Sequence, residues 1–210
     1  GKEFAKYWMH NAFLNIDNKK MSKSLGNFFT VRDISEKYDL QVLRFFMLSA
    51  HYRSPLNFSA DLMEAAKNGL ETIITGVENL KYAISVTDKE SMDESEKALV
   101  EEAKKFITKF DEAMDDDFNT ADAISAIFEL IKFANTNGDG KKSKEFLQAL
   151  LDEVKMLCDI CGLEVDKKEE LLDGDIEALI EERTAARKAK NFARADDIRD
   201  ELLNKGLILE

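Results

Sequence analysis

Two lysines in a short polar loop carry the clearest chemical signal in the sequence. Lys20 and Lys23 lie three residues apart in the run KMSKS (Lys20–Ser24), and Gly26 follows. Each lysine is a compact positive charge on a flexible side chain, which can follow negative charge during phosphate chemistry. When a carboxylate attacks the α-phosphate of a nucleoside triphosphate, charge builds up on the departing pyrophosphate, and cations placed there stabilise the transition state. The loop is therefore predicted to close over a polyphosphate.

The residues around this loop narrow the interpretation further. KMSKS is the signature of class I aminoacyl-tRNA synthetases, and five fixed residues in a row arise by chance in roughly one random chain in ten thousand of this length. With its flanking segments, the loop resembles the cysteinyl-tRNA synthetase family. Those segments are Tyr7–Ile16 before the loop, Leu25–Phe28 after it and His51–Phe58 further along. A lysine- and serine-rich surface loop without such a role is the alternative.

The resemblance implies an activity and a role for each residue of the loop. Members of this family join cysteine to tRNA(Cys) through a cysteinyl-adenylate, using ATP with Mg²⁺ and releasing AMP and pyrophosphate. By this resemblance Lys23, together with Lys20, stabilises the pyrophosphate end of the transition state. Met21, Ser22 and Ser24 complete the ATP-binding loop. The expected partners of the intact protein are therefore ATP, cysteine and tRNA(Cys).

Several parts of such an enzyme are absent from the 210 residues. Family members carry a HIGH motif, a Rossmann fold and a zinc site upstream of the lysine loop. Here the only histidines are His10 and His51, and no cysteine precedes Cys158. We therefore expect the C-terminal portion of a synthetase, cut at both ends, which alone catalyses no ATP–pyrophosphate exchange. Zinc is expected only in the missing upstream part, and no metal ligands are assigned in this chain.

Composition predicts a helical protein with one or two small domains. A single proline and nine glycines stand among 30 Lys and Arg and 42 Asp and Glu, which favours helices over sheets. No apolar run approaches the length of a membrane span, and the first residues lack a signal-peptide pattern. Two cysteines do not build a secreted disulfide framework. We expect a cytoplasmic monomer without a membrane partner.

The net charge of −12 is unevenly distributed along the chain. Residues 1–57 contain nine Lys and Arg against five Asp and Glu, a net charge of +4, and residues 176–210 contain seven against eight, a net charge of −1. The remaining −15 falls on residues 58–175. Because an acidic segment repels phosphates, the middle of the chain is predicted to be a scaffold, and the two ends are predicted to meet anionic ligands.

Periodicity and family resemblance together predict a mainly α fold in three parts. Residues 1–58 are expected to form the C-terminal end of a class I catalytic domain, with the KMSKS loop and a stem-contact fold. Residues 59–164 are expected to form an antiparallel helical bundle that serves as a tRNA-binding scaffold, and residues 165–210 a small, truncated anticodon-binding module. The predicted helices cover about residues 31–38, 40–48, 59–86, 95–115, 120–137, 142–160, 176–190 and 192–204, and residues 12–16 are predicted to form a short strand.

The last of these parts contains the candidate tRNA-binding residues. Arg183, Arg187, Lys190 and Arg194 recur at near-helical spacing, in a segment similar to the module that reads the anticodon in cysteinyl-tRNA synthetases. Arginine can stack on unpaired bases and bind phosphates. The alternative is a solvated helical face on which these cations are balanced by neighbouring Asp and Glu residues.

Several other side chains have two possible roles. Arg44 lies in an apolar helix, where an internal ion pair is favoured over a contact with the loop or with tRNA. Tyr52 and Arg53 could contact RNA or brace a turn, and the residues do not decide between these. Trp8 and His10 could touch a ligand, but packing at a domain edge is favoured.

Two clusters resemble metal sites but favour a structural role. The run Asp115–Thr120 contains three aspartates, yet its spacing is not that of a calcium loop, and Asp and Asn are good helix caps. Cys158 and Cys161 form a lone CxxC without a second ligand pair. Both thiols are predicted to fill the end of the bundle as small apolar groups.

Two rival functions remain open at this point. One is a cysteine ligase that loads a small sugar amine in place of tRNA, against which the basic run Arg183–Arg199 argues. The other is a helical RNA-binding or scaffold domain without catalysis, against which the lysine signature argues.

Overall fold

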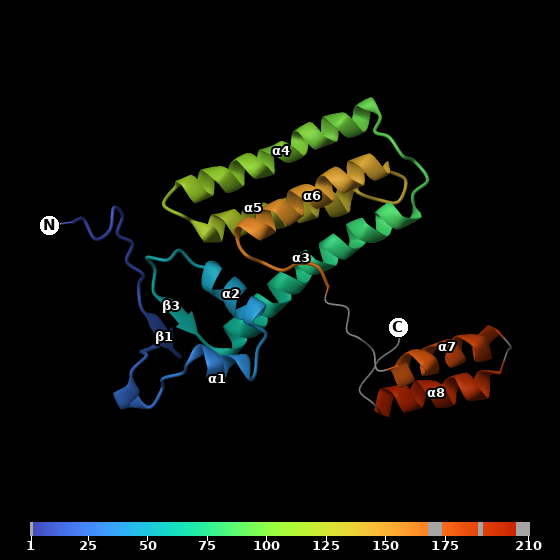
Figure 1. The fold of residues 1–210 in the computed structure, drawn as a ribbon, viewed down its shortest axis with the longest axis horizontal. Coiled ribbons are helices and arrows are strands. Elements are labelled where there is room, and N and C mark those ends of the chain that lie inside the picture. Colours follow the sequence, from blue (N-terminus) through green and yellow to red (C-terminus); the bar gives the residue numbers. More distant parts are fainter. Residues whose placement is uncertain (1, 168–173, 189–190, 205–210) are drawn as a thin grey trace. The chain divides into compact units, whose positions relative to one another are not determined.

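The computed structural model describes residues 2–167, 174–188 and 191–204, and it divides into two compact units, Gly1–Lys167 and Lys168–Glu210. The first unit combines a small three-stranded sheet with a long helical bundle, and the second is a helical hairpin (Figure 1). The mainly α fold is confirmed. Within the described residues, no helix is both long and apolar enough to cross a lipid bilayer.

The sheet that leads into the lysine loop is built on a tight hairpin. Strand β1 (Leu14–Ile16) pairs antiparallel with β2 (Lys19–Lys20), and β3 (Leu56–Phe58) pairs parallel with β1 on its other side. Asp17 and Asn18 both have positive φ, at 48° and 62°. Such a two-residue turn matches the twist of a hairpin and suits Asp and Asn. The hairpin therefore delivers Lys20 directly from the end of β2 into the loop.

Two short helices follow the loop, and the second joins the sheet to the bundle. Helix α1 (Val31–Ser35) begins at a capping box in which Thr30 and Asp33 bond to each other's backbone. Helix α2 (Leu40–Leu48) buries Phe45 and Phe46 and packs against the first bundle helix.

Four amphipathic helices form the bundle, each starting at a side-chain cap. They are α3 (Ala60–Val86), α4 (Glu94–Asp115), α5 (Thr120–Asn137) and α6 (Lys144–Ile160). Their N-caps are Ser59, Asp93, Asn119 and Ser143, and each accepts a hydrogen bond from a backbone N–H in the first turn. The predicted helix boundaries agree with these to within a few residues.

The order of the bundle helices in space differs from their order along the chain. Helices α5 and α6 lie between α3 and α4, so that α4 packs on α5 and α6 (Figure 1). The linker between α3 and α4 is hydrogen-bonded to the start of α6. Thr87 Oγ1 donates to the carbonyl of Lys142 at 2.6 Å, and the N–H of Lys144 donates to the carbonyl of Lys89 at 2.8 Å.

The bundle core is continuous and closely packed. Side chains without exposed surface line its axis, and they include Ile73, Val77, Ile127, Leu130, Phe146, Leu147, Leu150 and Leu157. Gly76 lets α3 approach α5 closely, because a Cβ at this position would lie 2.7 Å from Cγ2 of Ile131.

One charged side chain is buried where α4 and α6 begin. Glu96 is only 1% exposed and accepts hydrogen bonds from the N–H and hydroxyl of Ser143, at 3.1 and 2.8 Å. It also accepts from the N–H of Asp93 at 3.2 Å and lies 3.0 Å from Nζ of Lys89. The carboxylate thus caps two helices at once, which compensates the cost of burying its charge.

The second unit is a hairpin of α7 (Gly174–Lys188) and α8 (Phe192–Asn204). Its buried side chains are small or aliphatic: Ala186, Ala195, Ile198 and Leu202. Asn191 begins the second helix, and its side-chain oxygen accepts from the N–H of Arg194 at 3.3 Å.

Some predictions about single residues and strands were wrong. Arg44 forms no ion pair within the described residues; it is exposed, and its guanidinium lies against Gly162, where a Cβ would be 2.9 Å from Nη1. Trp8 is 66% exposed and stacks on His10 and Phe4, so it does not pack at the edge of this unit. Strand β1 starts two residues later than predicted. Strands β2 and β3 were not predicted, because two or three residues are too few to show an alternation of apolar and polar side chains. The division at residues 58 and 164 stays a prediction.

Candidate functional site

The predicted phosphate-binding loop is a short exposed segment between β2 and α1. Lys20 ends β2, and Lys23 begins a single 3₁₀ turn, η1 (Lys23–Leu25). Gly26 ends that turn in the left-handed region, with φ of 68°, and its N–H donates to the carbonyl of Lys23 at 3.2 Å. Glycine is the residue that adopts this conformation without strain. Both lysines are exposed, and neither lies within a long helix.

The loop is held by one amide side chain. Asn27 Oδ1 accepts from the N–H of Ser22 at 2.9 Å, and Asn27 Nδ2 donates to the carbonyl of Lys20 at 3.2 Å. The hydroxyls of Ser22 and Ser24 are hydrogen-bonded to each other at 2.7 Å. Asn27 therefore closes the backbone from Lys20 to Ser22 into a hydrogen-bonded ring.

The two lysines keep their charge available for a ligand. Among the described residues, no carboxylate lies within ion-pair distance of Lys20 or Lys23. The nearest described partner of the Lys23 ammonium is the Phe28 ring, with Nζ 5.3 Å from its centroid. An anionic ligand would thus meet these cations without first breaking an ion pair.

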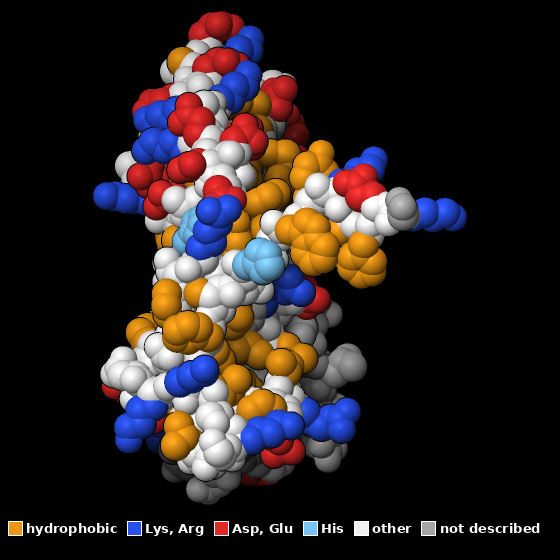
Figure 2. All heavy atoms as spheres, turned by 90° about the vertical axis from the view of Figure 1, so that its left-hand side faces the viewer, with side chains coloured by type: hydrophobic (Ala, Val, Ile, Leu, Met, Phe, Trp, Pro, Cys, Tyr) orange, Lys and Arg blue, Asp and Glu red, His pale blue; other side chains and the backbone are white. Residues whose placement is uncertain are grey.

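The face that carries the loop differs in surface character from the bundle. Figure 2 shows basic and acidic side chains intermixed over the bundle, whereas hydrophobic side chains, with Lys and Arg side chains beside them, gather around the small sheet. The exposed hydrophobic residues of the N-terminal segment and the loop are Phe4, Tyr7, Trp8, Met9, Phe13, Leu25, Phe28 and Phe29.

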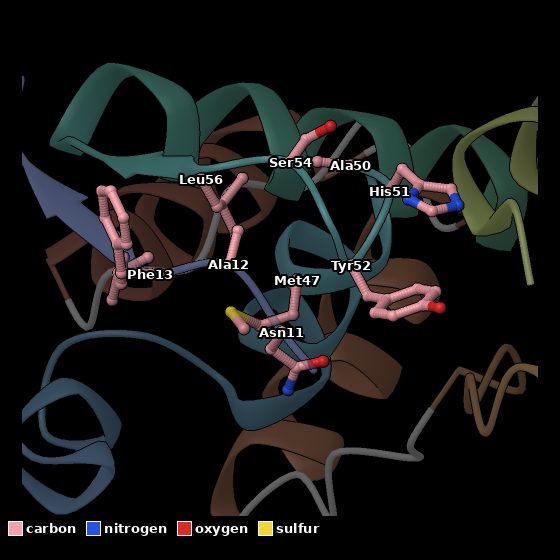
Figure 3. A pocket seen from close by; sticks show the side chains of 10 residues that line it. Asn11, Ala12, Phe13, Met47, Ala50, His51, Tyr52, Ser54 and Leu56 are labelled. Atoms are coloured by element: carbon pink, nitrogen blue, oxygen red, sulfur yellow. The ribbon is translucent and has the colours of Figure 1, made fainter. Parts of the chain in front are cut away.

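A small pocket lies beside β1, between its lead-in and the segment that follows α2 (Figure 3). The backbone N–H of Ala12 donates to the carbonyl of Tyr52 at 2.9 Å, which joins its two walls. The lining residues are Asn11, Ala12, Phe13, Leu14, Met47, Ala50, His51, Tyr52, Ser54 and Leu56. Its volume is about 140 Å³. Because ligand pockets usually enclose about 300 Å³ or more, this one is too small for a nucleotide.

Tyr52 and Arg53 brace the turn between α4 and α5. The Tyr52 hydroxyl donates to Asp117 Oδ1 at 2.8 Å, and Arg53 Nε lies 3.0 Å from Asp117 Oδ2. His51 Nε2 lies 3.8 Å from the same carboxylate. The hydrogen bond to Tyr52 and the charge of Asp117 raise the pKa of Arg53 above its usual value. These contacts support the bracing interpretation over RNA contact.

The acidic run Asp115–Thr120 ends one helix and starts the next, as predicted. Asn119 caps α5, and Asp116 is the C-cap of α4. Asp117 and Phe118 have positive φ, at 56° and 55°, which reverses the chain between the helices. In the part of the chain that the structure describes, no three carboxylate, imidazole or thiol side chains lie close enough to hold a metal ion.

The two cysteines are packed as apolar groups at the end of α6, which confirms that prediction. Cys158 is fully buried and Cys161 nearly so. Burial, with a smaller contribution from Cys161, raises the pKa of Cys158 to about 12. Burial also raises the pKa of Cys161. Both thiols therefore stay protonated at neutral pH, a poor state for metal binding or nucleophilic attack.

The predicted tRNA-binding residues have different surroundings. Arg187 is exposed on α7, and Arg183 is half-buried there, its Nε buried without a hydrogen bond in the described part. Arg194 on α8 is tied to Glu182 on α7, with 2.8 Å between Nε and Oε1, and this contact raises the pKa of Arg194. Lys190 lies outside the described residues. The hairpin thus brings Arg194 beside α7, where Glu182 balances the positive charge of Arg194.

Sequence reasoning missed Asn27 and Asp117, although both lie in segments that it singled out. Asn27 belongs to the flank Leu25–Phe28 and had no role assigned, while Asp117 was treated only as a cap. A polar residue directly after a loop-ending glycine is the available signal for Asn27, since such residues often bond back to the loop backbone.

Comparison with known protein families finds three matches along the chain. Residues 1–68 match the model of the tRNA synthetases class I (C) catalytic domain, residues 109–166 match the DALR domain, and residues 169–210 match the cysteinyl-tRNA ligase anticodon binding domain.

Individual relatives align over the entire chain. A protein named cysteine–tRNA ligase from Lachnospira eligens is 64% identical over 210 residues, covering 100% of this chain and 44% of the relative. Proteins of the same name from Lachnoclostridium phytofermentans and Clostridioides difficile are 57% and 52% identical, over 100% of this chain and 46% and 45% of their own lengths. The chain thus spans somewhat less than half the length of these curated relatives.

A solved structure supports the fold. The LeuRS of Agrobacterium radiobacter K84, solved in a ternary complex with tRNA and LeuAMS, superposes with a TM-score of 0.59 at 20% identity, over 70% of this chain and 20% of that one. With high identity along its full length and three matching domain models, this chain belongs to the cysteine–tRNA ligase family of class I aminoacyl-tRNA synthetases.

Proposed function

We propose that the protein containing this chain is a cysteine–tRNA ligase, which attaches cysteine to tRNA(Cys) at the expense of ATP. The observation that carries the proposal is the identity of 50–64% to proteins of that name over all 210 residues. The match extends from the lysine loop to the C-terminal helical hairpin, so it covers both of the predicted ligand-binding ends.

The lysine loop would act in the first chemical step. The cysteine carboxylate attacks the α-phosphorus of ATP, the bond from that phosphorus to the bridging oxygen breaks, and pyrophosphate leaves with the bonding electrons. Lys23, with Lys20, stabilises the charge that grows on the leaving pyrophosphate. Both ammonium groups are exposed on a glycine-ended loop, without an ion-pair partner in the part of the chain that the structure describes, and this supports the role. Met21, Ser22 and Ser24 shape the rest of the ATP-binding loop.

Mg²⁺ would enter this site with the nucleotide. Since the described residues offer no cluster of metal ligands, the phosphates of ATP would be its main ligands on this side of the site. When bound there, Mg²⁺ would share the phosphate charge with the two lysines.

The second unit would bind the tRNA that receives cysteine. The match of residues 169–210 to an anticodon binding domain supports tRNA binding by the hairpin. Arg183 and Arg187 on α7 and Arg194 on α8, with Lys190 between the helices, are the proposed contacts. In the second step, a tRNA hydroxyl attacks the carbonyl of cysteinyl-adenylate and AMP leaves. The protein is proposed to act as a cytoplasmic monomer.

The same match disfavours the two rival functions. A ligase that acts on a small sugar amine has no need of an anticodon binding domain, yet residues 169–210 match one. A scaffold without catalysis has no need of a class I catalytic segment, yet residues 1–68 match one.

Cysteine-dependent ATP–pyrophosphate exchange by the full-length protein tests the catalytic half of the proposal. Wild-type protein should exchange with cysteine and not with serine, and Lys23→Ala should lower the rate about a hundredfold or more, the size typical of losing one transition-state donor. Lys132→Ala removes an exposed lysine of α5 and should leave the rate unchanged. Equal rates for the Lys23→Ala and Lys132→Ala proteins would refute the role of the loop.

Binding of the 210-residue chain to tRNA(Cys), compared with a second tRNA at two salt concentrations, tests the RNA-binding half. We expect preference for tRNA(Cys), with affinity that falls as salt rises. Arg187→Ala should weaken binding, while Lys132→Ala should not. Equal affinity for both tRNAs would leave only a general RNA-binding role.

A further inference from the structure

The lysine loop is held by a single side chain that lies outside the KMSKS signature. Asn27 bonds to the backbone at two points, the carbonyl of Lys20 at 3.2 Å and the N–H of Ser22 at 2.9 Å. These two points flank Met21, so one amide closes the first half of the signature into a ring. The second half of the signature is closed by the 3₁₀ turn, in which the N–H of Gly26 donates to the carbonyl of Lys23.

The ring sets the direction in which the two ammonium groups leave the backbone. Strand β2 fixes the residues before Lys20, and its pairing with β1 gives that lysine a defined starting point. Beyond it, the N–H of Met21 still donates to the carbonyl of Leu14 at 3.4 Å, and the chain then leaves β1. The two Asn27 bonds restrain the backbone on both sides of Met21, at the start of the interval over which Lys20 and Lys23 must meet one pyrophosphate.

The ammonium group of Lys23 lies over a neighbouring aromatic ring. Its Nζ lies 5.3 Å from the centroid of Phe28, the residue directly after Asn27. This contact is weak at an exposed site, so a polyphosphate can displace it. Asn27 and Phe28 together thus hold both the backbone and the charge of the loop in one arrangement.

We propose that Asn27 is a positioning residue for the lysine loop: its amide fixes the backbone between Lys20 and Lys23, so that both ammonium groups reach the leaving pyrophosphate together. Asn27 itself touches no reacting atom. The proposal rests on the proposed function for its catalytic consequence, but the structural part, a loop held by this amide, can be tested without any activity.

Limited trypsin digestion of the 210-residue chain tests the structural part, because trypsin cleaves after lysine and the loop contains two. Asn27→Ala should accelerate cleavage after Lys20 and Lys23 severalfold, since the loop must open locally to enter the protease. Asn27→Asp keeps the acceptor for Ser22 but loses the donor to Lys20, so an intermediate rate is expected. Asn79→Ala is the matched control and should behave as wild type. It removes an exposed hydrogen bond between the side-chain amides of Asn79 on α3 and Asn135 on α5.

Cleavage sites in the bundle, after Lys104 and Lys105 of α4, report whether a variant is still folded. If Asn27→Ala is cut in the loop at the wild-type rate while these sites stay protected, the proposal is overturned. If the bundle sites open as well, the Asn27→Asp protein provides the comparison, and wild-type loop protection in that variant would likewise overturn it.

Exchange kinetics of the full-length protein test the catalytic part. Asn27→Ala should lower kcat about tenfold or more, because a small misplacement of catalytic groups costs up to about a hundredfold in rate. The KM for cysteine should change little, since the loop contacts only ATP in the proposal. An unchanged kcat with a loosened loop would reject the positioning role. If the wild-type protein fails to exchange at all, the proposed function fails instead, and the trypsin result still stands.

Discussion

The lysine loop and the helical bundle are held together by different kinds of interaction. The bundle buries a continuous set of aliphatic and aromatic side chains and starts every helix at a cap. The loop and the sheet before it expose most of their large side chains and depend on a few hydrogen bonds, chiefly those of Asn27. The bundle should therefore open only with global unfolding, whereas the loop can open locally.

The charge distribution differs between the same two regions. Residues 1–57 carry a net charge of +4, whereas residues 58–175 carry −15. In the bundle, lysines are paired with carboxylates one helical turn away, as in Lys97 with Glu94 and Lys105 with Glu102. The loop lysines have no such partners among the described residues. The bundle thus neutralises many of its cations locally, whereas the proposed phosphate-binding loop has no ion-pair partner for its lysines among the described residues.

The largest effect is expected from a cavity in the bundle core. Ile127 has no exposed surface, and Ile127→Ala should lower the free energy of unfolding by about 2–5 kcal/mol, through lost burial and the cavity left behind. Thermal unfolding followed by circular dichroism measures this. Ser125→Ala, an exposed change on the same helix, serves as the control. A small effect at Ile127 would mean that the bundle is less well packed than its burial indicates.

A smaller but still substantial effect is expected at the buried carboxylate of Glu96. Glu96→Ala leaves the N–H and hydroxyl of Ser143 without their acceptor, so the free energy of unfolding should fall by about 1–3 kcal/mol. Urea unfolding at neutral pH is the appropriate measurement. If the free energy of unfolding fell by less than about 0.5 kcal/mol, water would have replaced the carboxylate as the acceptor for Ser143.

The same group predicts a dependence of stability on pH. Burial opposes ionisation of Glu96, but hydrogen bonds from Lys89, Ser143 and Asp93 outweigh it and lower its pKa below the ordinary 4.5. Because the folded-state pKa is the lower one, the stabilisation is present above about pH 4.5 and is lost as the pH falls through the folded-state value. The stability difference between wild type and Glu96→Gln should therefore shrink on acidification. A constant difference from neutral to acidic pH would contradict this.

The contact between the sheet region and the bundle should contribute less. Asp117 accepts a hydrogen bond from Tyr52 and forms an ion pair with Arg53. Tyr52 and Asp117 are only partly buried and Arg53 is exposed, and ion pairs open to solvent contribute about 0–1 kcal/mol. Asp117→Ala should therefore cost on the order of 1 kcal/mol, including strain at its positive φ. Asp116→Ala, at the adjacent position without these contacts, is the control in the same denaturation experiment. Equal behaviour of the two variants would show that the brace adds nothing.

The smallest effect on global stability is expected in the loop itself. Asn27→Ala removes two hydrogen bonds, but both lie in an exposed segment that unfolds locally, so the midpoint of bundle unfolding should shift by about 0.5 kcal/mol or less. Circular dichroism of this variant, compared with Ile127→Ala, separates local from global stability. A large loss would mean that the loop is part of the cooperative core.

Sequence reasoning was most successful where one kind of pattern repeats over many residues. The helices of the bundle are long and amphipathic, so their number, their boundaries and the capping role of Asn119 followed from apolar spacing and cap residues. The same reasoning failed for β2 and β3, which are too short to show alternation, and for Arg44, whose apolar neighbours in sequence do not surround it in space.

The sequence by itself determined the family, the helical architecture and the identity of the candidate lysines, because signature residues, helical periodicity and caps are local properties of the chain. Only the tertiary structure decided which side chains meet across long separations: Asp117 with Tyr52 and Arg53, Glu96 with Ser143, and the placement of α4 against α5 and α6. The physical reason is that a polar side chain can satisfy its hydrogen bonds with many partners, and packing of the core selects which of them comes within reach.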